Sequence, residues 1–196
     1  MPAIYTARDL PVLRTAAYQF LKKKRVRHVQ GCEKEAYAIA LKYGADPVQA
    51  AVAAILHDIT KALDLNDQLI LCNRYGIICD DIEKNNPSLL HSKTGAHRAR
   101  ELFDIDQPVF DAIWWHTTGK PDMTLLEKVL YLADYIEPTR DFEGIEKLRR
   151  AVYTDIDRAM ALGLKMSIED VEQRGFPLHH NTEDAFEYYK EYLTDA

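Results

Sequence analysis

The sequence predicts an all-α protein that folds as a single-domain helical bundle. Apolar residues recur at helical spacing between clear helix start and stop signals along most of the chain. No segment shows the alternation of apolar and polar residues, bounded by hairpin turns, that a half-buried strand needs. The connections between helical segments are short and free of Pro/Gly/Ser-rich linkers, so we expect one domain over residues 1–196.

The composition narrows the classes of function. With 196 residues, of which 47% are hydrophobic and 29% charged, the chain can build one sizeable core. The net charge of −6 argues against a general nucleic-acid-binding surface. No stretch approaches the ~18 apolar residues of a membrane span, and the N-terminus lacks a signal-peptide pattern. Three cysteines without a CxxC pair suit a reducing compartment, so we expect a cytoplasmic protein.

The first two predicted helices have clear ends. Apolar residues at helical spacing predict a helix over residues 26–43, which Gly44 ends in the left-handed conformation. Asp46 is a typical N-cap and Pro47 a typical first helical residue, so a second helix begins here. Its residues are almost all apolar up to Leu56, which predicts burial on most sides.

Three further helices begin at residues whose side chains can accept hydrogen bonds from the first turn. These residues are Asn86 before Pro87, Asp106 before Pro108, and Thr124, which forms a capping box with Glu127. The last of the three helices ends before Pro138. The remaining chain, from about residue 142 to 175 and from 182 to 193, is also predicted to be helical.

Asp58 lies at the end of the most apolar helix, directly after His57. A carboxylate in such a place must be neutralised, hydrogen-bonded or bound to a cation, because burying an isolated charge is costly. The imidazole of His57 adds a second ligand type at the same position. A bound metal ion explains both residues together.

The same conflict between polarity and burial recurs on other predicted helices. Taken singly, a histidine on an apolar face is more often a hydrogen-bonded core residue, and an ion pair or a cap explains an aspartate equally well. Taken together, the residues favour a metal centre, which satisfies them all at once. They are His28, His91, His116 and Asp134. Imidazoles and carboxylates without thiolates suit iron, manganese, zinc or cobalt, and so many ligands indicate two ions bridged by Asp58.

His28, the doublet His57-Asp58 and the distant Asp134 form an ordered H…HD…D pattern, which resembles the HD phosphohydrolase superfamily. The runs HDITK, HSKTGAHRA, HTTG and ADYIEPTRDFEGI are similar to those of the YqeK family of symmetrical dinucleoside tetraphosphatases, over roughly residues 20–190. This resemblance implies an HD-type bundle, with the core motif region at about 20–140 and C-terminal helices packed on it. It also implies two metal ions, with iron favoured, held by His28, His57, Asp58, His91, His116 and Asp134. His97, on the same predicted helix, is an alternative to His91.

The activity that the resemblance implies is cleavage of diadenosine tetraphosphate between its central phosphates to give two ADP. Metal ions would lower the pKa of bound water from ~15.7 towards ~7 and offset the charge of the transition state. A metal-activated hydroxide would then attack phosphorus, and the expected catalytic residues are Asp58 and Lys61.

A polyphosphate substrate also needs fixed cations and hydrogen-bond donors. The candidates lie beside the motif residues: Arg27, Lys61, Lys93, Thr117, Gly119 and Arg140. Each alone has a plainer interpretation as a solvated charge or an ordinary loop, and the basic run over residues 22–28 is either a steering surface or a solvated helix end. The expected ligands are a dinucleoside polyphosphate and product-like ADP or GDP, with no nucleic acid and no membrane; a homodimer is an open alternative to a monomer.

Two rival functions stay open. Another HD enzyme, acting on mononucleotides or as a phosphodiesterase, would use the same metal site. The residues after the doublet, Ile59-Thr60-Lys61, lack the paired acidic residues associated with guanosine polyphosphate hydrolases. A catalytically silent nucleotide-binding regulatory module would keep the helical scaffold, but it would be expected to have lost ligands.

Overall fold

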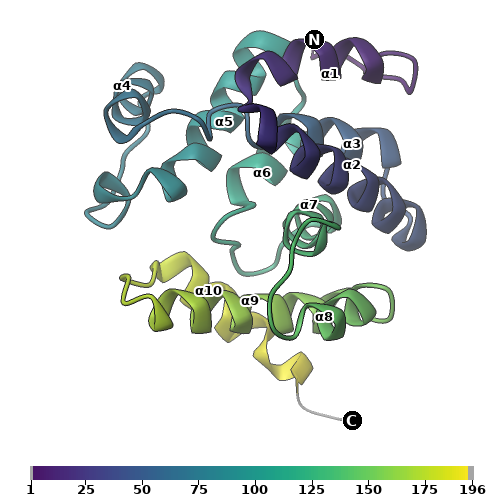
Figure 1. Ribbon diagram of the computed structural model, residues 1–196, viewed down its shortest axis with the longest axis vertical. Coiled ribbons are helices and arrows are strands. Elements are labelled where there is room, and N and C mark those ends of the chain that lie inside the picture. Colours follow the sequence, from purple (N-terminus) through teal and green to yellow (C-terminus); the bar gives the residue numbers. More distant parts are fainter. Residues whose placement is uncertain (1, 194–196) are drawn as a thin grey trace.

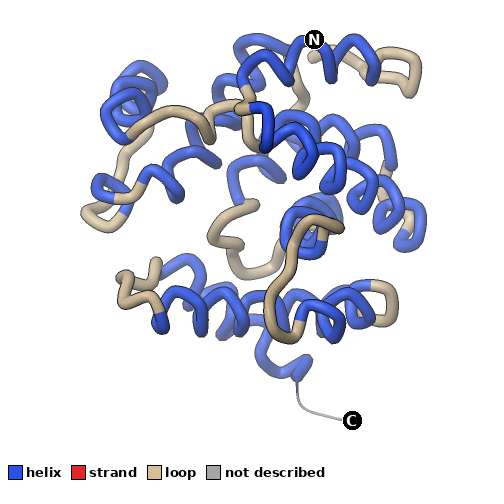
Figure 2. The backbone as a smooth tube through the Cα atoms, in the orientation of Figure 1, coloured by secondary structure: helices blue, strands red, loops and turns tan. Residues whose placement is uncertain are grey.

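The computed structural model describes residues 2–193, which form helices joined by turns and contain no strand (Figures 1 and 2). The all-α prediction is therefore confirmed. The helices are α1 Leu10–Ala17, α2 Lys23–Tyr43, α3 Pro47–Leu56, α4 Leu65–Tyr75, α5 Pro87–Phe103, α6 Gln107–Trp115, α7 Leu125–Ile136, α8 Ile145–Val152, α9 Ile156–Gln173 and α10 His180–Tyr189. Short 3₁₀ turns cover Tyr18–Phe20, Glu83–Asn85 and Lys190–Leu193.

Helix α2 packs against α3 and α7, and α6 packs against α3, α5 and α7. The C-terminal helices form a separate group in Figure 1, with α7 lying between them and the first six helices. Helix α9 contacts α7, α8 and α10, so α7 links the two groups. Buried apolar side chains from nine of these ten α-helices, all but α4, form one cluster, which includes Leu13 near one end of the chain and Tyr189 near the other.

The predicted helix boundaries around α3 are confirmed. Gly44 ends α2 with a φ of 80°, a left-handed conformation that glycine adopts without steric cost. The carboxylate of Asp46 accepts hydrogen bonds from the backbone N–H groups of Val48 at 2.8 Å and Gln49 at 3.2 Å. Every residue from Ala50 to Leu56 is buried, so the end of α3 lies deep in the protein.

The other three predicted N-caps are also confirmed. The side chains of Asn86 and Asp106 accept backbone N–H groups at the starts of α5 and α6. Thr124 and Glu127 form the reciprocal capping box at the start of α7. Because these caps set where each helix begins, they also set the register of the histidines and the aspartate that the helices carry.

The predicted helix over residues 142–175 is wrong in one respect, because the structure divides it into α8 and α9. Asp155 accepts hydrogen bonds from the backbone N–H groups of Asp157 and Arg158, at 3.0 Å and 3.1 Å, and so caps a new helix. The final helix, predicted from residue 182, begins at His180. No helix in residues 2–193 combines the length and apolar character needed to cross a membrane.

Candidate metal centre

The structure brings the six side chains predicted as metal ligands together. They come from five places along the chain: His28 on α2, His57 and Asp58 directly after α3, His91 on α5, His116 at the end of α6, and Asp134 on α7. Five of these residues are at most 5% exposed. The side chain of Asp134 retains 18% of its accessibility, so the cluster opens towards solvent on the α7 side.

One group of ligand atoms surrounds Oδ2 of Asp58. His57 Nε2 lies 3.3 Å from this oxygen and 3.4 Å from His28 Nε2, which in turn lies 3.0 Å from Oδ1 of Asp134. Ligand atoms bound to one ion at ~2.1 Å lie roughly 3.0–3.4 Å apart, so these separations match a shared cation. The first group can therefore hold one metal ion.

A second group surrounds the other oxygen of the same carboxylate. His91 Nε2 lies 3.2 Å from Oδ1 of Asp58 and 3.0 Å from His116 Nε2. Within residues 2–193, Oδ1 of Asp58 is buried and has no hydrogen-bond partner. A buried carboxylate oxygen left in this state is costly unless a cation lies against it. Asp58 thus offers one oxygen to each group, as a bridging ligand does.

The four histidines share one orientation. Their Nδ1 atoms donate to protein acceptors, which leaves the lone pair of each Nε2 directed into the cluster. For His57, His91 and His116 the acceptor is the carbonyl three residues earlier: Ala54 at 2.7 Å, Ser88 at 2.7 Å and Ile113 at 2.6 Å. For His28 the acceptor is Oε1 of Glu137 at 3.0 Å. Metal-ligating histidines are typically oriented in this way.

The electrostatics of the cluster also favour a cation. Burial opposes the charged form of Asp58, but the neighbouring His57 and His91 hold the pKa of this carboxyl well below its usual range. Burial, together with Lys61, lowers the pKa of His91 to about 4, and burial also lowers the pKa of His116. Both imidazoles are therefore neutral at pH 7 and free to ligate.

The stretch of chain that carries this cluster matches a known protein family. Residues 25–139 match the HD domain, a stretch that contains all six clustered residues. The chain belongs to the HD domain family. The match confirms the resemblance to the HD superfamily that the H…HD…D pattern indicated.

Individual relatives cover most of the chain. A symmetrical bis(5'-nucleosyl)-tetraphosphatase of Halalkalibacterium halodurans is 40% identical over 83% of this chain and 87% of its own length. A Bacillus subtilis protein of the same name is 35% identical over 84% of this chain and 88% of its own length. A solved structure described as a predicted HD superfamily hydrolase involved in NAD metabolism, from Clostridium acetobutylicum, superposes with a TM-score of 0.89 at 34% identity, covering 96% of this chain and 99% of that one.

Sequence reasoning missed Glu137, which supports the HD domain cluster from behind His28. Its carboxylate is fully buried and accepts hydrogen bonds from His28, from the backbone N–H of Thr139 at 2.7 Å and from the Thr139 hydroxyl. Its only signal in the sequence is its place three residues after Asp134. The segment that follows α7 is held by Arg149, which donates to the carbonyls of Ile136 at 3.0 Å, Glu137 at 3.1 Å and Arg140 at 3.0 Å.

Two of the cations predicted to bind substrate lie beside the centre. Lys61 Nζ is 3.4 Å from Nδ1 of His91, and burial lowers the pKa of this lysine. Arg140 donates to Oδ1 of Asp134 at 2.8 Å and to the carbonyl of the same residue at 3.0 Å. The structure therefore places both side chains next to ligand residues.

Arg27, also predicted to bind substrate, is exposed on α2, whereas Arg25 lies beside Asp58. The Nε–H of Arg25 donates to Oδ2 of Asp58. Residues two apart on a helix point about 200° apart, so Arg25 and Arg27 cannot share a face of α2. The basic run over residues 22–28 does not indicate which of the two arginines lies beside Asp58.

The other three residues predicted to contact phosphate have partners within the protein. Lys93 forms an ion pair with the buried Glu83, and its Nζ lies 5.4 Å from the centroid of the Trp114 ring. The Thr117 hydroxyl shares a hydrogen bond of 3.0 Å with that of Ser92. The backbone N–H of Gly119 donates to the carbonyl of Trp115 at 2.9 Å, so it is not available to a phosphate. In each case, a partner within the protein already uses the polar group.

The rival ligand His97 lies elsewhere. Its ring stacks on Tyr75 with 5.0 Å between the centroids and meets Phe110 edge to face at 5.1 Å. It belongs to none of the groups in residues 2–193 that could hold a metal ion. The structure therefore favours His91 over His97.

Asp80, His179 and His180 form another cluster of ligand-type side chains. Nδ1 of His179 accepts the backbone N–H of Asn181 at 3.1 Å, so the proton of the neutral ring lies on Nε2. That nitrogen is 3.0 Å from Oδ2 of Asp80 and, carrying the proton, has no lone pair to offer a metal ion. The cluster joins the start of α10 to the segment before α5.

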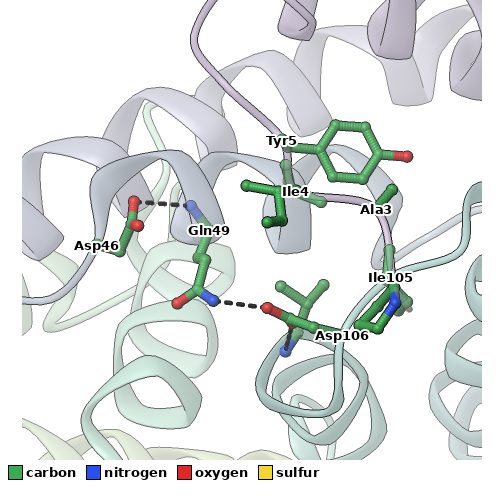
Figure 3. A pocket seen from close by; sticks show the side chains of 10 residues that line it. Ala3, Ile4, Tyr5, Asp46, Gln49, Ile105 and Asp106 are labelled. Atoms are coloured by element: carbon green, nitrogen blue, oxygen red, sulfur yellow. Dashed lines mark hydrogen bonds between the residues drawn. The ribbon is translucent and has the colours of Figure 1, made fainter.

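A cavity of about 190 Å³ lies between the N-terminal segment and the first turns of α3 and α6 (Figure 3). None of the six clustered residues lines it. Its polar groups are already paired: Asp46 caps α3, Asp106 caps α6, and Gln49 donates to Asp106 at 2.7 Å. The cavity therefore offers no free polar group for chemistry.

Proposed function

We propose that this HD domain protein is a metal-dependent hydrolase that cleaves diadenosine tetraphosphate between its central phosphates to give two ADP. The observation that carries the proposal is the position of Asp58, whose two oxygens face separate histidine groups. The names of relatives that are 35–40% identical over more than four-fifths of the chain support the substrate and the symmetrical cleavage.

The proposed centre holds two ions, with Asp58 shared between them. His28, His57 and Asp134 would complete the first site, and His91 and His116 would complete the second. Bound metal ions of this kind supply an activated water and offset the negative charge of phosphate oxygens. Iron is favoured by the family resemblance, and manganese, cobalt and zinc suit the same nitrogen and oxygen ligands.

The side chains of the protein itself hold the substrate on the open side of the centre. Arg25 and Arg140 flank the two aspartates, with side chains 28% and 36% exposed. Lys61 adds a third cation beside His91. Charge-assisted hydrogen bonds from such groups orient a polyphosphate and stabilise the charge that develops as the phosphoanhydride bond breaks. The buried histidines behind them exclude solvent from the opposite side.

The experiment that tests this proposal is product analysis. Metal-loaded protein is incubated with diadenosine tetraphosphate, and the products are separated by ion-exchange chromatography. Two ADP supports symmetrical cleavage, whereas AMP plus ATP rejects it. Faster turnover of mononucleotides or cyclic nucleotides would favour another HD phosphohydrolase or a phosphodiesterase. Bound metal without turnover of any nucleotide would favour a silent regulatory module.

Four further points stay predictions, and each has a direct measurement. Metal analysis of the protein purified from its natural host identifies the metal, and sedimentation tests the homodimer. Calorimetric titration measures the product-like binding of ADP or GDP, and fractionation of the host tests the cytoplasmic location.

A further inference from the structure

We propose that the cavity between α7 and α9 is the binding site for one nucleoside of the substrate, with Phe142 and Tyr135 as the aromatic walls for a purine base. This inference rests on the proposed function, because it assigns a nucleoside half of the dinucleotide to a place in the fold. It uses a cavity whose lining residues, apart from Arg140, play no part in the metal cluster.

Arg140 connects this cavity to the metal centre. Its guanidinium donates to Asp134, and the same side chain lines the cavity. Tyr135, the residue after Asp134 on α7, lines the cavity as well. A nucleotide whose phosphates are held by Arg140 beside the metal ligands therefore has its nucleoside at the mouth of this cavity.

The size and walls of the cavity suit a nucleoside. Its volume is about 610 Å³, within the ~300–1,000 Å³ typical of small-molecule sites. The rings of Tyr135 and Phe142 meet at an angle of 74° with 5.4 Å between their centroids, so they form a corner. A base can stack on one ring while its edge meets the other. Met166 adds a polarisable apolar surface to the same wall.

The charges along the cavity give the nucleotide a direction. Arg140 lies at the end near the metal centre, whereas the rest is lined by Gln173, by Glu143, Glu169 and Asp170, and by Arg174, whose charge is paired with Asp170 at 3.0 Å. Carboxylates repel phosphate but accept hydrogen bonds from the N–H groups of a base or from ribose hydroxyls. The phosphates therefore lie at Arg140 and the nucleoside lies among the acids.

A second cavity beside Asp58 has the opposite character. Its volume is about 200 Å³, and its lining consists of Leu21, Lys22, Lys24, Arg25, Lys61 and Ala62. It contains four cationic side chains and no aromatic ring, which suits phosphates and offers a base nothing to stack on. This contrast assigns the nucleoside to the cavity that Phe142 lines.

Phe142 is held in place by its neighbours. Arg149 anchors the segment before it through the carbonyls of Glu137 and Arg140. Gly144 follows with a φ of 85°, and a Cβ there would lie 2.7 Å from Cε of Met166. The aromatic wall therefore exists before a ligand arrives, which lowers the entropic cost of binding.

The test is calorimetric binding of ADP and of inorganic pyrophosphate to the metal-loaded protein. The variants are Phe142→Ala, Phe142→Leu and Phe142→Tyr, with Phe186→Ala as the matched control, since Phe186 is a partly buried phenylalanine on α10 outside the cavity. Loss of base stacking predicts that Phe142→Ala weakens ADP binding about 5- to 100-fold. Pyrophosphate affinity stays unchanged, and Phe142→Tyr and Phe186→Ala behave like the original protein.

Phe142→Leu keeps apolar bulk in the core but removes the ring, so it decides the matter if the alanine variant fails to fold. Unchanged ADP affinity in this variant, or an equal loss for ADP and pyrophosphate, would overturn the inference. Because binding is measured without turnover, the result stands apart from the proposed function. A protein that fails to cleave diadenosine tetraphosphate can still show the ring-dependent binding of ADP.

Discussion

Nδ1 of His28 lies 3.0 Å from Oε1 of Glu137, a fully buried carboxylate 109 residues later in the chain. This hydrogen bond turns Nε2 of His28 towards Asp58 and Asp134. The residue that orients the first ligand thus follows the last ligand, Asp134, by three positions. The short stretch 134–137, at the end of α7, therefore carries one candidate ligand and the support of another.

Replacing Glu137 by Gln should weaken metal binding about 10- to 100-fold, the range typical when a hydrogen-bond partner of a metal-binding histidine is lost. The carboxylate accepts hydrogen bonds from His28 and twice from Thr139, whereas an amide has a single acceptor atom. The measurement is metal retention in competition with a chelator. Glu172→Gln, at an exposed position on α9, is the control and should leave retention unchanged.

Replacing Gly31 by Ala should damage the centre although Gly31 is not a ligand. A Cβ at this position would lie 2.6 Å from Oε2 of Glu137 and 3.1 Å from Cδ of Pro138, so the support of His28 must shift. Gly163→Ala is the matched control, because it also lies in a helix interior but its added Cβ meets only atoms at 3.7 Å or beyond. Alanine favours a helix by about 1 kcal/mol over glycine, so the control should be neutral or stabilising.

Thermal unfolding and metal content separate these two glycine variants. Gly31→Ala should bind less metal, whereas Gly163→Ala should bind as much as the original protein. Equal metal content in the two would show that Glu137 tolerates displacement and is not needed to orient His28.

Arg25 and Arg27 should differ in their effect on turnover. Arg25 donates to Asp58 at the open side of the centre, whereas Arg27 is exposed. Removing a charged hydrogen-bond donor costs about 1.5–3 kcal/mol, so Arg25→Ala should lower kcat/KM for diadenosine tetraphosphate about 10- to 100-fold. Arg27→Ala should stay within about twofold. A larger loss of kcat/KM in Arg27→Ala than in Arg25→Ala would mean that Arg27, the residue predicted from the sequence, contacts the phosphates.

This pair illustrates how far the sequence predicts the site. Caps and stop signals act within a few residues, so Asp46, Thr124 and Gly44 mark the helix ends correctly. Ligand-type side chains that follow apolar runs, such as Asp58, stand out because burial makes them costly.

Other features depend on contacts between distant segments and leave little trace in the sequence. The support of His28 by Glu137 depends on how α2 packs against the segment after α7. The position of Arg25, rather than Arg27, beside Asp58 depends on how α2 packs against the end of α3. The ion pair of Lys93 is another such feature, since its partner Glu83 lies in a turn that carries no motif. Local patterns thus predict the candidate ligands, and only tertiary packing reveals the residues that support them.

Glu83 should make stability depend on pH in the acid range. Burial opposes its ionised form, but His179 and Lys93 lower its pKa from 4.5 to about 2. A depressed folded-state pKa means that the stabilisation is present above pH ~4.5 and is lost as the pH falls towards ~2, by about 2–4 kcal/mol in total. In the Glu83→Gln variant, this contribution to the pH dependence of folding stability should be absent.

Denaturant unfolding of the two proteins, each kept metal-free with a chelator, between pH 5 and pH 2 measures the difference. The stability curves should converge as the pH falls. Parallel curves across this range would mean that Glu83 has an ordinary pKa and that its contacts with Lys93 and His179 contribute little.

The central claim is that Asp58 joins two histidine groups into one hydrolytic centre, and metal content measured beside turnover tests it most directly. The purified protein loaded with iron under anaerobic conditions should hold two ions per chain and convert diadenosine tetraphosphate into two ADP. The Asp58→Ala variant, if its helical content is unchanged, should hold less than one ion and show no turnover. Two ions per chain with undiminished hydrolysis in Asp58→Ala would contradict the account.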